Sequence, residues 1–221
     1  MDSLCNQSVA RISMRFVIGP PPDVDDFDPK VSGWHRVHEL GPWPLVLLGS
    51  ILGIPLCASF IFAWSSFVQI PMSLQIDLRN QSPWPIIAGI LITVFSLIAS
   101  IAAVIVVHEF IHALAFPRMG FTRSTIVGVW PSRLLPYAAY VDEVYCIHLL
   151  FVLLAPLLLL SVVPVVLCAL TGSNIGVFAA VSCFNALLSG GDVVMAATIL
   201  FQVPLFAKIR NSGWYSWWKP A

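Results

Sequence analysis

Charged residues are scarce in this sequence. Only 10% of its 221 residues are charged, the formal net charge is zero, and no block rich in lysine and arginine occurs. The lack of a basic patch argues against nucleic acid as a partner. Hydrophobic residues make up 58% of the chain and its mean hydropathy is +0.89. These values exclude an ordinary water-soluble domain, and we expect an integral membrane protein.

The sequence also lacks CxxC pairs and the pattern of a cleavable signal peptide. Its five cysteines have no zinc-ribbon spacing, so we interpret them as small hydrophobic residues rather than structural ligands or disulfides. The first 42 residues are polar, and three consecutive prolines at 20–22 are followed by four aspartates. We therefore expect the first membrane span itself to direct insertion.

Four apolar runs reach the roughly 20 residues that a bilayer crossing requires, at 43–70, 84–116, 146–170 and 175–203. They predict an all-α integral membrane protein with about four transmembrane helices. The loop at 117–145 is rich in β-branched and aromatic residues, so we allow for one or two short strands there. The predicted organisation is a polar N-terminal segment (1–42), a four-span membrane domain (43–203) and an aromatic C-terminal tail (204–221).

The basic residues predict how the chain is oriented. With four spans, ten of the eleven lysines and arginines fall on one side, and only Arg79 falls on the other. The positive-inside rule makes the crowded side cytoplasmic, with both termini inside. The end of the tail, GWYSWWKPA, carries four aromatic residues, which indicate an anchor at the membrane interface rather than a ligand site: Trp214, Tyr215, Trp217 and Trp218.

A motif of polar residues ends the second apolar run. The 22 residues from Ile86 to Val107 are uncharged, and the next five read HEFIH. Positions i and i+4 share a helix face, so His108 and His112 can bind one metal ion while Glu109 acts as general base, as in the HExxH zincin pattern. The alternative is a pair of interfacial histidines, with Glu109 reaching water. Chance would give this spacing in roughly one or two such chains per thousand.

The third metal ligand is predicted by elimination. Glu109 and Asp192 are the only acids in the four spans, and ionisable residues inside a membrane are costly enough to indicate function. At about 1.5 Å per helical residue, Asp192 lies at nearly the depth of the two histidines. The alternative is a salt bridge or polar kink, but no lysine or arginine lies in any span. His148 is a less suitable ligand because it lies alone at the end of a span.

Two more polar residues precede Asp192 on the same predicted helix face. Asn185 and Ser189 could bind the substrate backbone, or they could form hydrogen bonds between helices, which is the commoner use of such residues. The adjacent pair Gly190-Gly191 weakens the helix where a carboxylate would have to lean toward a metal ion.

The motif HEFIHALAF, together with Asn185 and Asp192 seven positions apart in a later span, resembles the site-2 protease class of intramembrane zinc metallopeptidases. It is more similar to the small four-span bacterial and archaeal proteins described as putative zincin peptidases. The resemblance implies Zn²⁺ as cofactor, His108, His112 and Asp192 as ligands and Glu109 as catalytic acid and base. Ala155-Pro156 is similar to a small-residue–proline element in the third core span. The chain departs from the class in having no proline between Asn185 and Asp192.

These observations predict a membrane metallopeptidase domain over 43–203 in a prokaryotic cell membrane. Its partners would be the lipid bilayer and a protein or peptide substrate cleaved near the cytoplasmic face. A strand edge in the loop at 117–145 could bind the unwound substrate, although an interfacial loop without substrate contact is an alternative. A catalytically inactive scaffold, metal-binding sensor or immunity-type protein is the second hypothesis. Metal transport is the third, but the outer halves of the spans offer few ligating residues.

Overall fold

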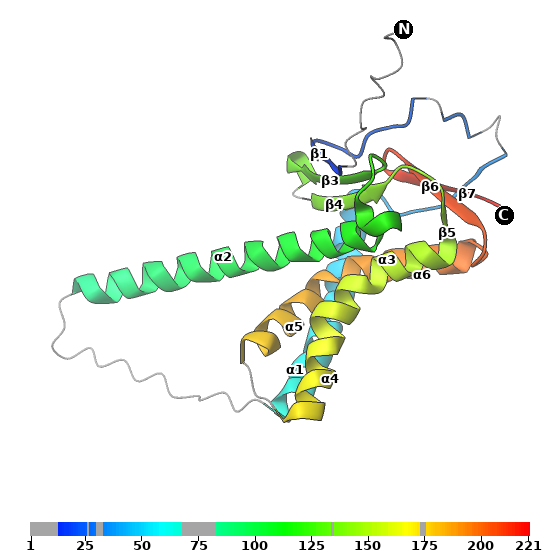
Figure 1. The fold of residues 1–221 in the computed structure, drawn as a ribbon. Helices are drawn as coiled ribbons and strands as arrows, with labels where there is room; N and C mark the ends of the chain where they lie inside the picture. The colour runs from blue at the N-terminus through cyan, green and yellow to red at the C-terminus, as the bar shows by residue number, and fades with distance from the viewer. Residues whose placement is uncertain (1–12, 26, 30–32, 68–82, 134, 173–175) are drawn as a thin grey trace, which may run out of the picture.

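The computed structural model describes residues 13–25, 27–29, 33–67, 83–133, 135–172 and 176–221 (Figure 1). Among these residues, three helices are long and apolar enough to cross a membrane, as expected of a membrane protein: α1 (Pro42–Ser65), α2 (Pro83–Ala115) and a composite helix over Cys146–Thr171. A fourth crossing exists if α5 (Gly176–Leu188) and α6 (Gly190–Gln202), which are bent by 45°, are counted together.

The composite helix contains a change of winding. It consists of α3 (Cys146–Pro156), the π-helical segment η3 (Leu157–Val162) and α4 (Val163–Thr171). Pro156 and Pro164, which have no N–H to donate, lie on either side of η3. π-helical turns are rare in proteins, and those that occur are often found near functional sites. The helix ends where Gly172 adopts a left-handed conformation with φ 68°.

The prediction of an all-α fold is wrong. The described residues are about 62% helix and 16% strand. One sheet has the order β1-β3-β4 and the other the order β2-β7-β6-β5. Their bounds are β1 (Arg15–Ile18), β2 (His35–Arg36), β3 (Thr125–Trp130), β4 (Leu135–Tyr140), β5 (Val144–Tyr145), β6 (Lys208–Ser212) and β7 (Tyr215–Lys219). Two short 3-10 helices, η1 (Pro117–Gly120) and η2 (Pro131–Arg133), flank β3.

The loop at 117–145 does form strands, but three of them, β3, β4 and β5, where one or two were allowed for. The error lies in the two ends of the chain, which were expected to be a polar segment and an interfacial tail. There β2 pairs with β7, so that His35 lies opposite Trp218. This pairing joins residues far apart in the sequence, and such contacts leave no local periodicity to detect. The domain boundaries at 42 and 203 remain a prediction.

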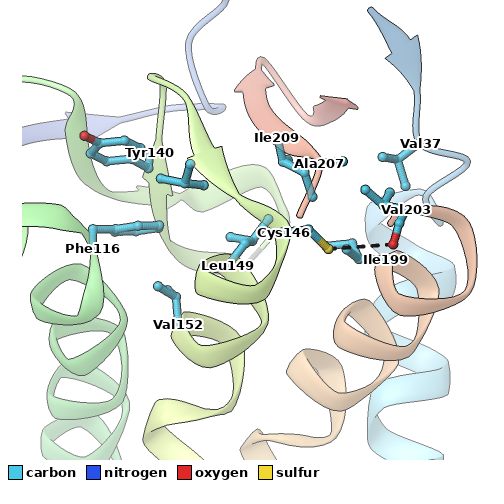
Figure 2. Close-up of a cluster of buried hydrophobic side chains, with 11 residues drawn as sticks. Val37, Phe116, Tyr140, Cys146, Leu149, Val152, Ile199, Val203, Ala207 and Ile209 are labelled. Carbon is cyan, nitrogen blue, oxygen red and sulfur yellow. Dashed lines mark hydrogen bonds between the residues drawn. The ribbon is translucent and has the colours of Figure 1, made fainter. Parts of the chain in front are cut away.

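A buried apolar cluster joins the sheets to the helix ends (Figure 2). Phe116, just after α2, stacks on Tyr140 of β4 with ring centroids 5.1 Å apart. Leu149 and Val152 of α3 and Ile199 of α6 are buried in the same cluster. Close packing of this kind fixes relative positions. The cluster therefore holds the C-terminal end of α2, which carries the HEFIH motif, against the N-terminal part of α3 and the C-terminal part of α6.

Helix α2 diverges from the other helices. In Figure 1 it runs at a wide angle from α1, α4 and α5, and none of its most apolar window is buried. Most of its exposed side chains are apolar, among them Ile90, Leu91 and Phe95. A helix with all its backbone groups paired internally and apolar side chains outside is suited to contact with lipid.

The described basic residues gather at the end of the molecule that carries the sheets. They lie in or beside β1, β2, η1, η2, β6 and β7 (Figure 1). Hydrogen bonds from Lys208 at 2.8 Å and Lys219 at 2.9 Å lower the pKa of Glu143, which directly precedes β5, and join it to β6 and β7. Three residues used in the orientation prediction lie outside the described residues: Arg11, Lys30 and Arg79. The orientation remains a prediction.

Candidate metal centre

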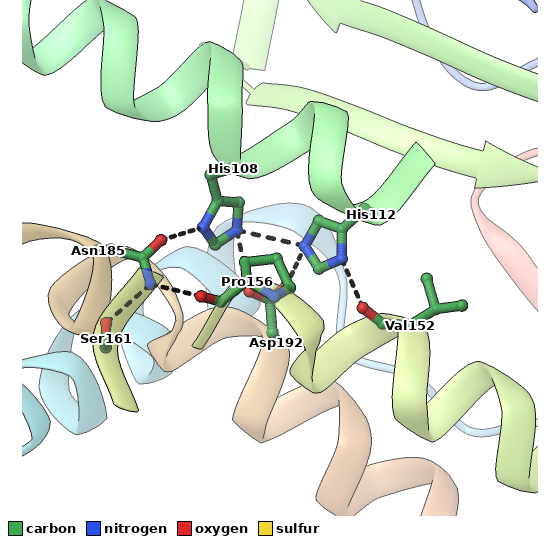
Figure 3. A network of polar contacts seen from close by, with 7 residues as sticks. All are labelled: His108, His112, Val152, Pro156, Ser161, Asn185 and Asp192. Atoms are coloured by element: carbon green, nitrogen blue, oxygen red, sulfur yellow. Dashed lines mark hydrogen bonds and ion pairs between the residues drawn. The ribbon is translucent and has the colours of Figure 1, made fainter. Parts of the chain in front are cut away.

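The last turns of α2 direct two imidazoles at one carboxylate of α6 (Figure 3). The Nε2 atoms of His108 and His112 lie 3.2 Å apart. Asp192 places Oδ2 3.1 Å from Nε2 of His108 and Oδ1 3.3 Å from Nε2 of His112. One ligand atom from each residue lies within 4.8 Å of the others, so this group could hold a metal ion. The structure thus brings together the three residues predicted as ligands.

In both histidines, the ring nitrogen that faces away from Asp192 (Nδ1) has a hydrogen-bond acceptor. Nδ1 of His112 lies 2.8 Å from the backbone oxygen of Val152, and Nδ1 of His108 lies 2.8 Å from Oδ1 of Asn185. The amide orientation of Asn185 follows from its Nδ2, which donates to the backbone oxygen of Pro156 at 3.0 Å. Because both acceptors are oxygens, each Nδ1 must carry the hydrogen. In the neutral rings, Nε2 is then left as the lone-pair donor that a metal ion requires.

With both imidazoles neutral and their hydrogens on Nδ1, the centre of the group contains acceptors only. Two Nε2 lone pairs and the carboxylate of Asp192 converge, and Oδ2 of Asp192 is buried without a hydrogen-bond partner in the described part of the chain. Atoms of this kind repel one another unless a cation lies between them. Two imidazoles and one carboxylate are a usual ligand set of catalytic zinc, which leaves a fourth position open. The residues therefore fit zinc.

Glu109 lies beside the group and lines the same cavity, whose volume is about 670 Å³. Its carboxylate interacts with the backbone N–H of Ala138 in β4. Most of the other lining side chains are apolar and come from α1, α3 and the α5–α6 region, including Leu45, Val46, Ile54, Leu149, Leu153 and Met195. A carboxylate next to a metal-binding group in an apolar cavity is suited to proton transfer.

Residues 101–205 match the model of the family described as "Putative zincin peptidase". This segment belongs to that family. The matched range contains the HEFIH motif and Asp192, and the family description indicates metallopeptidase activity. Comparisons with curated proteins and with solved structures gave no match. The family predicted from the motif is confirmed, whereas the relation to site-2 proteases remains a prediction.

Three further residues of the zincin-family segment were predicted as candidates. Asn185 and Ser189 are fully buried and are not among the residues that line the cavity. The Oγ of Ser189 has no hydrogen-bond partner among the described residues. Their substrate-binding role stays a prediction. His148, the alternative ligand, lies outside the group, and its Nε2 is 2.9 Å from the backbone oxygen of Ala115.

A third carboxylate lines the same cavity beside those of Glu109 and Asp192, and it was not among the predicted site residues. Glu39 accepts hydrogen bonds from the backbone N–H of Ser216 at 2.8 Å and from its Oγ at 2.5 Å, and Ser216 Oγ lies 2.8 Å from Oδ1 of Asn211. Burial raises the pKa of Glu39, and the hydrogen bonds from Ser216 oppose this effect. Since its contacts are to β7, Glu39 links the segment after β2 to the C-terminal hairpin. No local pattern in the sequence indicates such a contact.

Glycines allow α1 to pass against the break between α5 and α6. A Cβ atom on Gly190 would lie 2.0 Å from the backbone oxygen of Gly49, and one on Gly53 would lie 2.2 Å from that of Leu187. Such backbone contact requires small residues, and the spacing of Gly49 and Gly53 is the GxxxG pattern. The crossing holds the first turn of α6, and therefore Asp192, against α1.

We expect Gly190→Ala to destabilise the protein by about 1–3 kcal/mol, because the added methyl group meets backbone atoms that cannot yield. Thermal unfolding in detergent would measure the effect. Gly191→Ala is the matched control, since a Cβ there has nothing within 4 Å. Equal stability of the two variants would contradict this account of the crossing.

Proposed function

We propose that this protein is a membrane-embedded zinc metallopeptidase that hydrolyses a peptide bond in a membrane-embedded or membrane-adjacent protein. The observation that carries the proposal is the convergence of His108, His112 and Asp192, without a hydrogen-bond donor between them, beside Glu109 in one cavity. The family description supports metallopeptidase activity. The proposal extends this to a substrate at the membrane because the motif ends the apolar helix α2.

In the proposed reaction, three residues would bind the metal ion and a fourth would transfer the proton. His108, His112 and Asp192 would hold Zn²⁺, which when bound supplies the Lewis acidity that activates water and polarises a carbonyl group. Glu109 would accept a proton from the attacking water and deliver it to the amine that leaves. The apolar lining of the cavity strengthens these electrostatic interactions, because fewer water dipoles screen them.

The free edge of β4 offers a binding site for the substrate. The N–H of Val141 donates to the oxygen of Ser124, and the register pairs Ala139 with Ile126. The alternation of an antiparallel ladder then turns the N–H and C=O of Ala138 away from β3. Within the described residues, no other strand pairs with this edge. An extended peptide added to β4 would cross the cavity beside Glu109.

Ala138→Pro deletes the outward N–H, which also interacts with Glu109, while the hydrogen bonds to β3 remain. A change in KM therefore reports on the β4 edge, and a change in kcat reports on Glu109. We expect KM to rise by up to roughly tenfold, the value of one hydrogen bond, with zinc content unchanged. Ala138→Ser keeps the N–H and is the control. An unchanged KM in the proline variant would show that the substrate does not pair with β4.

The function itself is tested with purified protein in proteoliposomes, loaded with zinc and mixed with a library of peptides from membrane-spanning segments. Mass spectrometry should detect cleavage products that disappear when a chelator removes the zinc. A zinc-loaded protein that cleaves none of the library would favour the inactive scaffold or metal-binding sensor instead.

The proposal also includes a location and an orientation. We place the protein in a prokaryotic cell membrane with both termini in the cytoplasm, in contact with the lipid bilayer and a protein or peptide substrate. The clustering of the described basic residues at the end with the sheets supports this orientation through the positive-inside rule. The metal-binding residues would then lie near the cytoplasmic surface.

A further inference from the structure

The backbone oxygen of Val152 is available to His112 because of a proline. In a regular α-helix, the oxygen of residue 152 accepts the N–H of residue 156. Residue 156 is proline, which has no N–H. Val152 O instead lies 2.8 Å from Nδ1 of His112, and both residues are buried. A proline in α3 thus leaves an acceptor for a histidine of α2.

The same proline supports the other histidine through Asn185 (Figure 3). The Nδ2 of Asn185 donates to the backbone oxygen of Pro156 at 3.0 Å and to Oγ of Ser161 at 2.9 Å. With both amide hydrogens used, Oδ1 faces Nδ1 of His108 at 2.8 Å. Pro156, Asn185 and Ser161 are all fully buried. The amide therefore cannot turn over without leaving buried polar atoms unpaired.

Two serines hold the helices in this arrangement. Oγ of Ser161 in η3 donates to the oxygen of Ser182 in α5 at 2.8 Å, and Oγ of Ser182 donates to the oxygen of Ser161 at 3.0 Å. This reciprocal pair lies one helical turn from Asn185. The position of Asn185 relative to Pro156 is therefore fixed at two points.

We propose that Pro156 and Asn185 are positioning residues that hold both histidines with Nδ1 protonated and Nε2 turned toward Asp192. The inference rests on the zinc site of the proposed function. Without its acceptor, a neutral imidazole can rotate or carry its hydrogen on Nε2, and it then no longer offers a lone pair to the metal ion. Loss of such an outer partner weakens metal binding by roughly 10–100-fold.

Pro156→Ala in the full-length protein tests the inference. The new backbone N–H competes with His112 for the oxygen of Val152, so we expect zinc affinity to fall by roughly 10–100-fold. Titration against a chromogenic chelator would measure this loss, and the visible spectrum of the cobalt(II)-substituted protein should change with the ligand geometry. The unfolding temperature of the metal-free protein should not fall, because alanine is a better helix former than proline. Pro164→Ala, in the same composite helix, is the control.

Two substitutions of Asn185 provide a test that does not depend on the helix. Asn185→Leu removes the acceptor for His108 and should weaken zinc binding as Pro156→Ala does. Asn185→Asp keeps an acceptor and should bind zinc at least roughly tenfold more tightly than the leucine variant. Wild-type zinc affinity in both Pro156→Ala and Asn185→Leu would overturn the inference while leaving the proposed function intact. A wild-type protein that binds no zinc would overturn both.

Discussion

Glu109→Gln is expected to abolish peptide cleavage and to leave zinc bound. Glutamine has nearly the same size and can still interact with the backbone N–H of Ala138, but it cannot accept a proton from water. Loss of a general base typically lowers the rate by roughly 10²–10⁴-fold. The measurements are kcat on a peptide that the wild type cleaves and zinc content by elemental analysis. A rate equal to that of the wild type would remove Glu109 from the reaction.

Glu39→Gln is the matched control, since Glu39 lines the same cavity. Its glutamine can accept the N–H of Ser216 and donate to Oγ of Ser216, which can in turn donate to Asn211, so all three contacts are kept. We expect cleavage close to that of the wild type. Equal losses in the two variants would indicate a general disturbance of the cavity rather than a specific role of Glu109.

The candidate metal-binding group was predictable because a membrane span makes polar residues informative. HEFIH places two histidines on one helix face, and Asp192 was the only other acid in the four spans. Because ionisable groups are costly to bury in lipid, the two acids within the spans could be assigned to one site without any knowledge of the fold. The structure places Asp192 beside the two histidines, although it follows them by 80 positions or more, with its Oδ2 3.1 Å from Nε2 of His108.

The supporting contacts were harder to predict because backbone atoms provide many of them. Val152 itself carries no sign that its oxygen accepts from His112, and the only signal is the proline four residues later. The similarity of Ala155-Pro156 to a family element drew attention to the place but not to this contact. The pairing of β2 with β7 and the contact of Glu39 with Ser216 link residues about 180 positions apart. Such contacts depend on the complete fold.

Asp192→Asn is expected to remove the zinc together with the stability that zinc provides. The wild type should bind about one zinc ion per chain. At a free zinc concentration of 100 times Kd, binding stabilises the folded state by about 2.7 kcal/mol, which a chelator would remove. The amide oxygen of asparagine is uncharged and a weaker ligand, so the variant should hold little zinc and unfold at the same temperature with and without zinc. Asp142→Asn, at an exposed carboxylate, should retain the zinc response.

The zinc contents of the Glu109 and Asp192 variants decide which carboxylate is the ligand and which is the base. These are the only two acids in the four spans, and both line the cavity. If Asp192→Asn kept its zinc while Glu109→Gln lost it, Glu109 would be the ligand and could not also act as general base, since one carboxylate cannot bind the metal ion and accept the proton at the same time. The geometry favours the opposite result, because the oxygens of Asp192 lie 3.1 and 3.3 Å from the two Nε2 atoms, whereas Glu109 interacts with β4.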